Sequence, residues 1–331
     1  MIDPAPAPQM NPDSERLTVF TMTYNYGRFL RQNLNGVARQ TTPPGRTIVR
    51  DDCSPNDSLA ELKEILAPYT WTEFHRNEEN LGPVKHFRAC VAQAETEFYH
   101  LHSGDDFLVD EHFYRDAIRI LDENPDIVMV FGYASSVLDN GRVITPHQPL
   151  PDRDWTRLEG GTLRRQLAFE NPVAAVCVVV RRSVHEELTP WEMDNPHVHD
   201  WLYWYLMSYC GDFARIERVV IHKHLHGDNV SEIYERAGAA ANHLDDGYGE
   251  LLARSELSDT ERRRVRIGRR RHRIRMATAA QFPIVCLREL FGRGAVGAIL
   301  ESLMERISRK ADKFRKRQRD RFLRKHAGQT W

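Results

Sequence analysis

The first 133 residues alternate strand-like and helix-like segments, and this alternation constrains the fold more than any other feature of the chain. Runs rich in β-branched and aromatic residues predict strands, and between them apolar residues recur at helical spacing. The predicted strands are 17–24, 46–52, 72–77, 97–102 and 126–133. The predicted helices begin near residues 29, 59, 82 and 111. This β-α-β-α order is typical of a mostly parallel sheet with helices on both faces.

Two pairs of adjacent aspartates follow predicted strands. Asp51 and Asp52 end the second strand, and Asp105 and Asp106 follow the fourth in the stretch HLHSGDDFL, where Gly104 favours a tight turn. Ligands of parallel α/β sheets gather at the carboxyl ends of the strands. Since neighbouring strand residues point to opposite faces, only one carboxylate of the first pair can face such a ligand. The second pair suits Mg²⁺ or Mn²⁺. The alternatives are a turn cap for the first pair and a solvated acidic turn for the second.

Two further stretches contain candidate chemistry. HKHLHGDN places His222, His224 and His226 at period two, on one face of a predicted strand. Three such histidines fit an independent zinc site, an ordinary exposed strand face, or one histidine that joins the aspartates on a metal. In HVHDWLYW, Asp200 precedes bulky aromatic residues at the start of a predicted helix. It fits a general base as well as a helix N-cap.

An acidic body precedes a basic tail. The chain of 331 residues has a formal net charge of -1, but residues 254–325 contain 23 Lys/Arg and 8 Asp/Glu. The tail mixes apolar and basic residues, which is typical of helices on anionic membrane surfaces. The alternatives are an appendage packed on the protein or on a second subunit, and a nucleic-acid contact through ERRRVRIGRRRHRIR. The nucleic-acid hypothesis leaves both aspartate pairs unexplained.

Several classes of protein are disfavoured. Five scattered cysteines without a CxxC pair indicate a reducing cytoplasm and no disulfide framework. No glycine-rich phosphate loop follows a predicted strand, which disfavours dinucleotide oxidoreductases and P-loop NTPases. No apolar run of about 18 residues is present, and the N-terminus lacks the core of a signal peptide. We expect a disordered lead-in (1–15), a first domain (16–236) and a basic helical region (237–331).

Six motifs, in order, resemble family 2 glycosyltransferases. TMTYNYGRFLRQNLNGVARQT is similar to the family opening, IVRDDCSPNDS to its V-D-D-x-S-x-D-x-S/T segment, and NEENLGPVKHFRACVAQA to its N-x-G helix entry. HSGDDF stands where the family has its metal-binding aspartates. HDWLYWYLM resembles the catalytic helix start, and HLHGDNVS resembles an H-G-x-N-x-S ending. Each motif is weak alone, whereas six in the expected order over about 17–231 are specific.

The resemblance implies a GT-A fold, which is an α/β, Rossmann-like nucleotide-sugar-binding fold. Its mixed, mostly parallel sheet would be flanked by helices, with a C-terminal helical appendage. The implied reaction is an inverting transfer of a hexosyl or rhamnosyl unit from a UDP- or dTDP-linked donor. The acceptor would be a hydroxyl of a glycan or lipid-linked molecule in bacterial polysaccharide or glycoconjugate biosynthesis. A divalent metal, Mn²⁺ or Mg²⁺, would assist. The expected location is the cytoplasm, including peripheral contact with the inner membrane face.

The resemblance also assigns roles residue by residue. The donor-binding residues would be Thr23, Tyr24, Asn25, Asp52, Lys85, Ser103 and Asp105. Among these, Asp52 would hydrogen-bond the base. The metal-binding residues would be Asp105, Asp106 and His226, with Asp106 the preferred direct ligand. Asp200 would be the catalytic base, and His199 and Trp201 would lie on the acceptor side.

Three positions depart from the family pattern. Ser103 stands where the family often has aspartate, His199 where it usually has glutamate, and Met22 where a proline is common. The first two departures make a degenerate protein, which binds a nucleotide sugar without catalysis, the main alternative. The C-terminal helices are also candidates for homo-oligomer contacts, and no nucleic-acid partner is expected.

Overall fold

The structure, a computed structural model, describes residues 3–144, 153–188, 199–226, 229, 240–254 and 256–276. Its contacts divide the chain into two compact units, Met1–Gly247 and Tyr248–Trp331. The predicted boundary lies earlier, after residue 236. The tail beyond Met276, with its predicted membrane and oligomer helices, lies outside the described residues, as does most of HGDNVS.

The first unit contains one mixed sheet, which the described residues build in the order β3-β2-β1-β4-β9-β6-β10-β5. Its parallel part comprises β1 (Leu17–Thr23), β2 (Arg46–Asp51), β3 (Glu73–Arg76) and β4 (Phe98–Ser103). The strands that continue the sheet are β9 (Val178–Arg181) and the long β6 (Ile127–Leu138) and β10 (Asp212–Leu225). The short strands are β5 (Phe107–Leu108), β7 (Val143–Ile144) and β8 (Trp155–Leu158). The predicted mixed sheet is confirmed.

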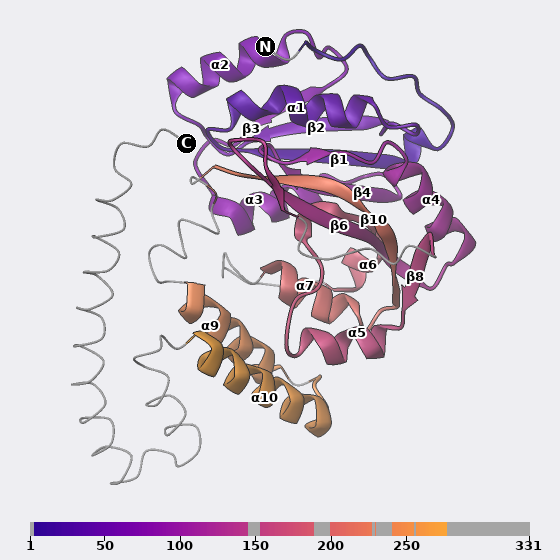
Figure 1. Cartoon of the computed structure of the whole chain (residues 1–331), viewed down its shortest axis with the longest axis vertical. Coiled ribbons are helices and arrows are strands. Elements are labelled where there is room, and N and C mark those ends of the chain that lie inside the picture. Colours follow the sequence, from indigo (N-terminus) through magenta and orange to yellow (C-terminus); the bar gives the residue numbers. More distant parts are fainter. Residues whose placement is uncertain are drawn as a thin grey trace, which may run out of the picture. The chain divides into compact units, whose positions relative to one another are not determined.

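The direction of the chain crossovers decides which face each helix covers. The chain passes from β1 to β2 through α1 (Gly27–Ala38), and from β2 to β3 through α2 (Asn56–Leu66). It then returns to β4 through α3 (Gly82–Val91). Because such crossovers are right-handed, the reversal puts α3 on the opposite face from α1 and α2. Figure 1 shows this arrangement.

Apolar clusters fill both sides of the sheet. Leu30 and Leu34 of α1 pack with Val49 and Leu62 in one buried cluster between α1, α2 and β2. A larger cluster joins β1, β4, β6, β9 and β10 to α4 (Phe113–Glu123). The helical and strand periodicities of the sequence explain both clusters, since they put the apolar side chains on the faces that meet.

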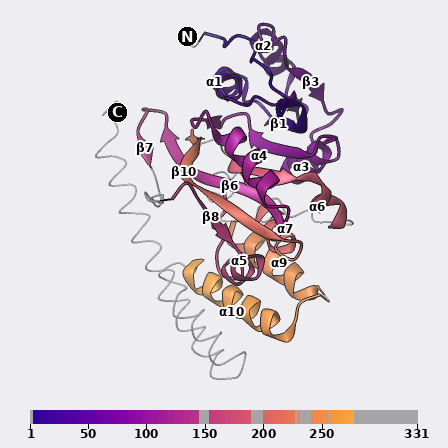
Figure 2. The ribbon, with the colours of Figure 1, turned by 90° about the vertical axis from the view of Figure 1, so that its right-hand side faces the viewer.

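The second part of the first unit is less regular, as the sequence indicates. The helices here are α5 (Gly160–Leu167), α6 (Arg182–Glu187) and α7 (His199–Met207), and a short 3₁₀ turn covers Ala175–Cys177. Another 3₁₀ turn, Ser14–Arg16, precedes β1. The apolar run 173–180 contains the turn Ala175–Cys177 and becomes β9 only at Val178. Figure 2 shows the long strands β6 and β10 side by side, and these two strands are parallel.

The N-terminal stretch, expected to be disordered, follows a defined path along α1. The Ala5 amide donates to Asn35 Oδ1 at 2.7 Å, and Asn35 Nδ2 donates to the Asp3 carbonyl at 2.8 Å. One buried asparagine side chain therefore holds two backbone groups of this stretch. No apolar anchor in this stretch signals the contact, since a polar side chain makes it.

The second unit begins within α9 (Ala240–Ala253) and continues into α10 (Asp259–Met276). Leu251 and Val265 are fully buried. The Arg262 guanidinium donates to the backbone carbonyls of Leu252, Arg254 and Leu257, so it satisfies acceptors at the end of α9. No helix among the described residues is both long and apolar enough to cross a membrane.

Candidate active site

The candidate site lies where the parallel strands end. Thr23 of β1 pairs with Asp51 of β2, and Met22 pairs with Ser103 of β4. The carboxyl ends of these three strands therefore meet at one edge of the sheet, which is where α/β proteins bind ligands. The two aspartate pairs of the sequence are adjacent in space for this reason.

Asp51 of the first pair has a structural role. Its side chain is fully buried and accepts hydrogen bonds from the Ser54 amide and hydroxyl and, at 3.2 Å, from Arg76 Nε. The Ser54 hydroxyl oxygen in turn accepts from the Asn25 amide. Asp51 thus fixes the turns after β1 and β2 against the end of β3, and its carboxylate is saturated by these partners.

Asp52, its neighbour, points to the opposite side and organises the entry to α3. One carboxylate oxygen accepts from Asn77 Nδ2 at 2.7 Å and from the Leu81 amide at 2.9 Å. The other accepts from the Gly82 amide at 2.9 Å. A carboxylate at the start of a helix is favoured by the helix dipole. The prediction that only one aspartate of this pair faces a ligand is consistent with this geometry, because Asp52 lines a cavity and Asp51 does not.

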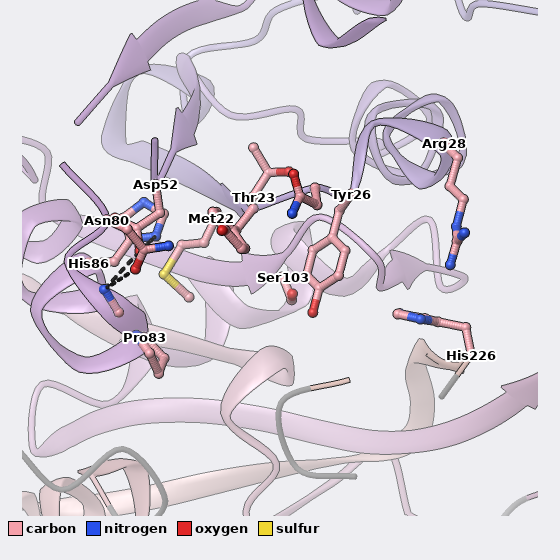
Figure 3. A pocket seen from close by; sticks show the side chains of 13 residues that line it. Met22, Thr23, Tyr26, Arg28, Asp52, Asn80, Pro83, His86, Ser103 and His226 are labelled. Atoms are coloured by element: carbon pink, nitrogen blue, oxygen red, sulfur yellow. Dashed lines mark hydrogen bonds and ion pairs between the residues drawn. The ribbon is translucent and has the colours of Figure 1, made fainter. Parts of the chain in front are cut away.

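This cavity has a volume of about 720 Å³. Six predicted site residues are among those that line it: Thr23, Tyr24, Asn25, Asp52, Ser103 and His226. The other lining residues are Met22, Tyr26, Arg28, Asn80, Gly82, Pro83 and His86. Figure 3 shows Asp52, Asn80 and His86 at one end, Arg28 and His226 at the other, and Ser103 between them. The cavity therefore has chemically distinct ends.

A carboxylate–imidazole pair lies beside the His226 end. Asp105 Oδ2 is 3.0 Å from His226 Nε2 and accepts from Asn229 Nδ2 at 2.9 Å. Oδ1 of Asp105 is buried and has no hydrogen-bond partner in the described part of the chain. No group of three or more metal-binding side chains is found among the described residues. A carboxylate oxygen without a partner next to an imidazole nitrogen is nonetheless a donor set that fits Mn²⁺ or Mg²⁺.

Asp106 lies deeper than Asp105. It is 3% exposed, and its Oδ1 accepts from the His224 amide at 3.2 Å. Burial raises the pKa of this carboxyl well above its usual range, and the neighbouring Asp105 raises the pKa further, against the opposing effect of Lys223. The repulsion between the adjacent carboxylates of Asp105 and Asp106 is therefore reduced, because Asp106 holds its proton more tightly than a free aspartic acid does.

The turn that carries both aspartates is hydrogen-bonded to α1. Asn33, fully buried, donates through Nδ2 to the Ser103 carbonyl at 3.1 Å and to the Asp106 carbonyl at 2.7 Å. Gly104 lies so close to β1 that a Cβ there would be 3.3 Å from the Met22 carbonyl oxygen and 3.2 Å from Leu30. A side chain at this position would therefore be tightly packed against β1 and α1, whereas the sequence suggested only a tight turn.

Six predicted residues are not among those that line the cavity: Asp105 and Asp106, described above, and four others. Lys85 is exposed on α3, although its neighbour His86 lines the cavity. Asp200, in the first turn of α7, accepts from Asn171 Nδ2 at 3.2 Å. Trp201 is buried, and its indole N–H donates to the Leu167 carbonyl at 2.6 Å, so it anchors α7. The fourth, His199, begins α7, and its side chain is outside the described part of the structure.

The three histidines at the end of β10 and just after it have different partners. The His222 ring contacts Phe107, with ring centroids 5.4 Å apart, and His224 Nε2 is 3.1 Å from Asp139 Oδ1. Only His226 reaches Asp105. This arrangement agrees with a single histidine beside the aspartates and gives no support to a three-histidine zinc site.

Several residues at or beside the cavity were not predicted. Asn229 was visible as the asparagine of the H-G-x-N motif. Arg28 and Tyr26 follow the T-Y-N turn, and their spacing gave no sign of a role. His86 lies in a segment whose apolar spacing predicts only a helix, so a polar residue on the buried face was the available signal.

Comparison with known proteins identifies the class. The sequence model of glycosyl transferase family 2 matches residues 18–189, which is more than half of the chain. The chain belongs to this family, and the protein is a glycosyltransferase.

Individual relatives are distant. The chain is 20% identical over 220 residues to an uncharacterised glycosyltransferase of Haemophilus influenzae, covering 66% of this chain and 68% of that protein. A Mycobacterium tuberculosis relative is 24% identical, and the match spans 64% of this chain but only 60% of that protein. Residues 1–349 of Staphylococcus aureus TarS, solved with UDP-GlcNAc, align with a TM-score of 0.59 at 16% identity, covering 84% of this chain and 88% of that one. The Pyrobaculum calidifontis mannosyltransferase PcManGT, solved with GDP-Man and Mn²⁺, aligns with a TM-score of 0.55 at 15% identity over 92% of this chain and 83% of that one. These likenesses confirm the GT-A fold.

Proposed function

We propose that this glycosyltransferase moves a sugar from a nucleoside-diphosphate donor to an acceptor hydroxyl, with inversion at the anomeric carbon. One observation carries the proposal. One cavity is lined by Asp52 after β2, by Ser103 at the end of β4 and by His226, whose imidazole is hydrogen-bonded to Asp105. That the TarS and PcManGT structures contain UDP-GlcNAc and GDP-Man supports a nucleotide-sugar donor here.

The two ends of the cavity orient the donor. The nucleoside would lie at the Asp52 end, where backbone amides and neutral side chains surround the carboxylate. The diphosphate would lie toward Arg28 and His226, because cationic and metal-binding groups stabilise phosphate charge. Ser103 would contact the part of the donor between the two ends. Lys85, exposed on α3, would contribute at most through the outer rim.

Asp105 and His226 would hold the divalent metal. When bound, this ion would offset the negative charge of the leaving diphosphate. Asp105 replaces Asp106 as the preferred direct ligand, because Oδ1 of Asp105 has no hydrogen-bond partner in the described structure, whereas Asp106 is occupied by the His224 amide. Asp106 would act through the turn that it closes, where its Oδ1 accepts from the His224 amide.

Asp200 would be the general base for the acceptor hydroxyl. Its carboxylate is half-buried in the first turn of α7, where Trp201 anchors the helix and Asn171 orients one oxygen. Since Asp200 does not line the cavity, the acceptor site would extend from the cavity toward α7. General base catalysis contributes about 10²–10⁴-fold to the rate.

Three variants test these roles. Purified protein is incubated with UDP-GlcNAc or GDP-mannose and Mn²⁺, and donor cleavage is followed in wild type, Asp200→Asn, Asp105→Asn and the control Asp13→Asn, which is exposed. Asp105→Asn should bind Mn²⁺ more weakly and should therefore need more Mn²⁺ for half-maximal cleavage. Asp200→Asn should bind donor as wild type does and lose about 10²-fold or more in transfer. Equal turnover in Asp200→Asn would remove it from the mechanism.

The same assay separates the rival hypotheses. A degenerate nucleotide-sugar binder would bind donor and show no cleavage with any divalent ion, and a nucleic-acid-binding protein would do neither. Proton NMR of the freshly released sugar reports its anomeric configuration. Inversion predicts the anomer opposite to that of the donor, and retention in the first product would refute it.

We also propose contact with an anionic surface through α10. A cavity of about 600 Å³ there is lined by the apolar Leu252 and Ile267 and by Arg263, Arg266, Arg269, Arg270 and Arg273. Clustered arginines bind phosphate groups through charge-assisted hydrogen bonds, and a lipid-linked acceptor would be held at such a surface. In liposome flotation, anionic vesicles should carry the protein and neutral vesicles should not. The double substitution Arg266→Glu with Arg270→Glu should abolish this difference, and Arg119→Glu on α4 is the control.

The location that fits these proposals is the cytoplasm. The described cysteines Cys53, Cys90, Cys177 and Cys210 are all free. Unpaired cysteines are typical of proteins kept in a reducing compartment. Cell fractionation would test this location, and recovery in an oxidising compartment would refute it.

A further inference from the structure

One buried histidine in the active-site cavity is not explained by the roles proposed above. His86 lies in the first turns of α3 and is 4% exposed, yet it lines the cavity beside Asp52 and Asn80. Figure 3 shows it at the end of the cavity away from Arg28 and His226. It therefore lies at the end where the proposed function puts the nucleoside.

The Nε2 atom of His86 is buried and has no hydrogen-bond partner. Among the cavity-lining residues that the structure describes, His86 alone has such a buried side-chain atom. His100 shows the usual state of a buried histidine, since its two ring nitrogens meet the Tyr114 hydroxyl at 2.7 Å and the Val176 carbonyl at 2.9 Å. A buried polar atom without a partner costs stability, so its presence in a cavity points to a ligand group.

The imidazole of His86 is neutral at physiological pH. Burial lowers its pKa to about 4, against the opposing effect of Asp52, whose Oδ2 lies 4.0 Å from Nδ1. The ring is also hydrogen-bonded to the Arg50 backbone. Because Nε2 has no partner, this bond engages Nδ1, which donates to the carbonyl. Nε2 therefore carries a lone pair without a hydrogen-bond donor, in a side chain that lines the cavity.

We propose that His86 is a specificity-determining residue that accepts a hydrogen bond from a ring N–H of the donor's nucleobase. The proposal rests on the nucleotide-sugar function and on the orientation of the donor given above. Uracil and thymine offer N3–H and guanine offers N1–H. The three partners of Asp52 fix the loop that faces this site, and the imidazole lies beside this carboxylate, where it can read the base edge.

The test uses UDP, dTDP and GDP, together with N3-methyl-UDP and N1-methyl-GDP, in calorimetric titrations with Mn²⁺. Wild-type protein should prefer one nucleotide and bind its methylated form more weakly, since the methyl group removes the donor. His86→Ala should bind the preferred nucleotide about three- to tenfold more weakly, as expected for one hydrogen bond. In this variant the penalty for methylation should disappear.

Two further variants keep the result interpretable. His86→Asn, which retains a side-chain acceptor, should recover part of the affinity and of the discrimination, whereas His75→Ala, at the half-exposed end of β3, should behave as wild type. Circular dichroism and thermal melting confirm that each variant is folded. A folded His86→Ala variant with wild-type affinity and an unchanged methylation penalty overturns the role of His86 alone. If wild type binds none of the nucleotides, the proposed function is refuted and this role with it.

Discussion

Asn33 connects the core of the protein to the metal-binding turn, and its replacement by leucine gives a quantitative prediction. The asparagine is fully buried on α1. Its Nδ2 holds the carbonyls of Ser103 and Asp106, and its Oδ1 accepts from the Thr21 hydroxyl at 3.0 Å. Leucine has nearly the same shape and none of these groups. Asn33→Leu therefore removes three hydrogen bonds without leaving a large cavity.

The magnitude follows from these three bonds. Each buried partner left without a hydrogen bond costs about 1–3 kcal/mol. Because one carbonyl belongs to a turn that can relax, we expect a total loss of about 3 kcal/mol in the free energy of unfolding. For a unit of this size, 1 kcal/mol corresponds to a change of about 2–4 °C in Tm. The expected decrease in Tm is thus about 6–12 °C.

The assay combines urea unfolding with Mn²⁺-dependent cleavage of the donor. Gln32→Leu, a half-buried neighbour on the same helix, is the matched control. Asn33→Leu should lose stability and should need more Mn²⁺ for half-maximal activity, because the turn with Asp105 is no longer fixed. If Asn33→Leu unfolds at the same urea concentration as Gln32→Leu and responds equally to Mn²⁺, the reasoning is refuted.

Three other predictions follow from burial. Asp106→Asn should raise Tm at pH 7, since the folded state binds the Asp106 proton more tightly than the unfolded chain and the carboxylate therefore costs stability. Burial lowers the pKa of both His86 and His100 to about 4. Between about pH 6.5 and 4 the unfolded chain binds more protons at these residues, so stability should fall as the pH decreases through this range. Gly36→Ala would put a Cβ 2.9 Å from the Leu108 carbonyl oxygen. It should lower the free energy of unfolding by about 1–3 kcal/mol, although alanine favours the helix.

Each of these has a direct measurement. Thermal melting of Asp106→Asn at pH 7 tests the first, and a lower Tm would contradict it. Urea unfolding from pH 7.5 to 4 tests the second, and His100→Gln should flatten the slope, whereas an unchanged slope would contradict the assignment to this histidine. A Gly36→Ala protein as stable as wild type would show that β5 moves away without cost.

The sequence by itself determined the order of elements and the place of the site. Periodic apolar residues predicted β1 to β4, α1 to α4, β6, α7 and much of β10, because amphipathic helices and buried strands need such patterns wherever they pack. The order of motifs also predicted the family. The sequence could not predict β5, β7 and β8. These strands are short, and their residues pair through backbone groups that have no signature in the sequence.

Only the tertiary structure decided what the candidate residues contact. Asp51 and Asp52 are adjacent and identical in the sequence, yet Arg76 and Ser54 saturate the first while the second faces the cavity. His86 and Lys85 are likewise adjacent, and the helix phase set by its packing on the sheet buries the first and exposes the second. A sequence pattern fixes which residue types alternate, whereas hydrogen-bond partners and solvent exposure depend on segments distant in the chain that meet only when the sheet forms.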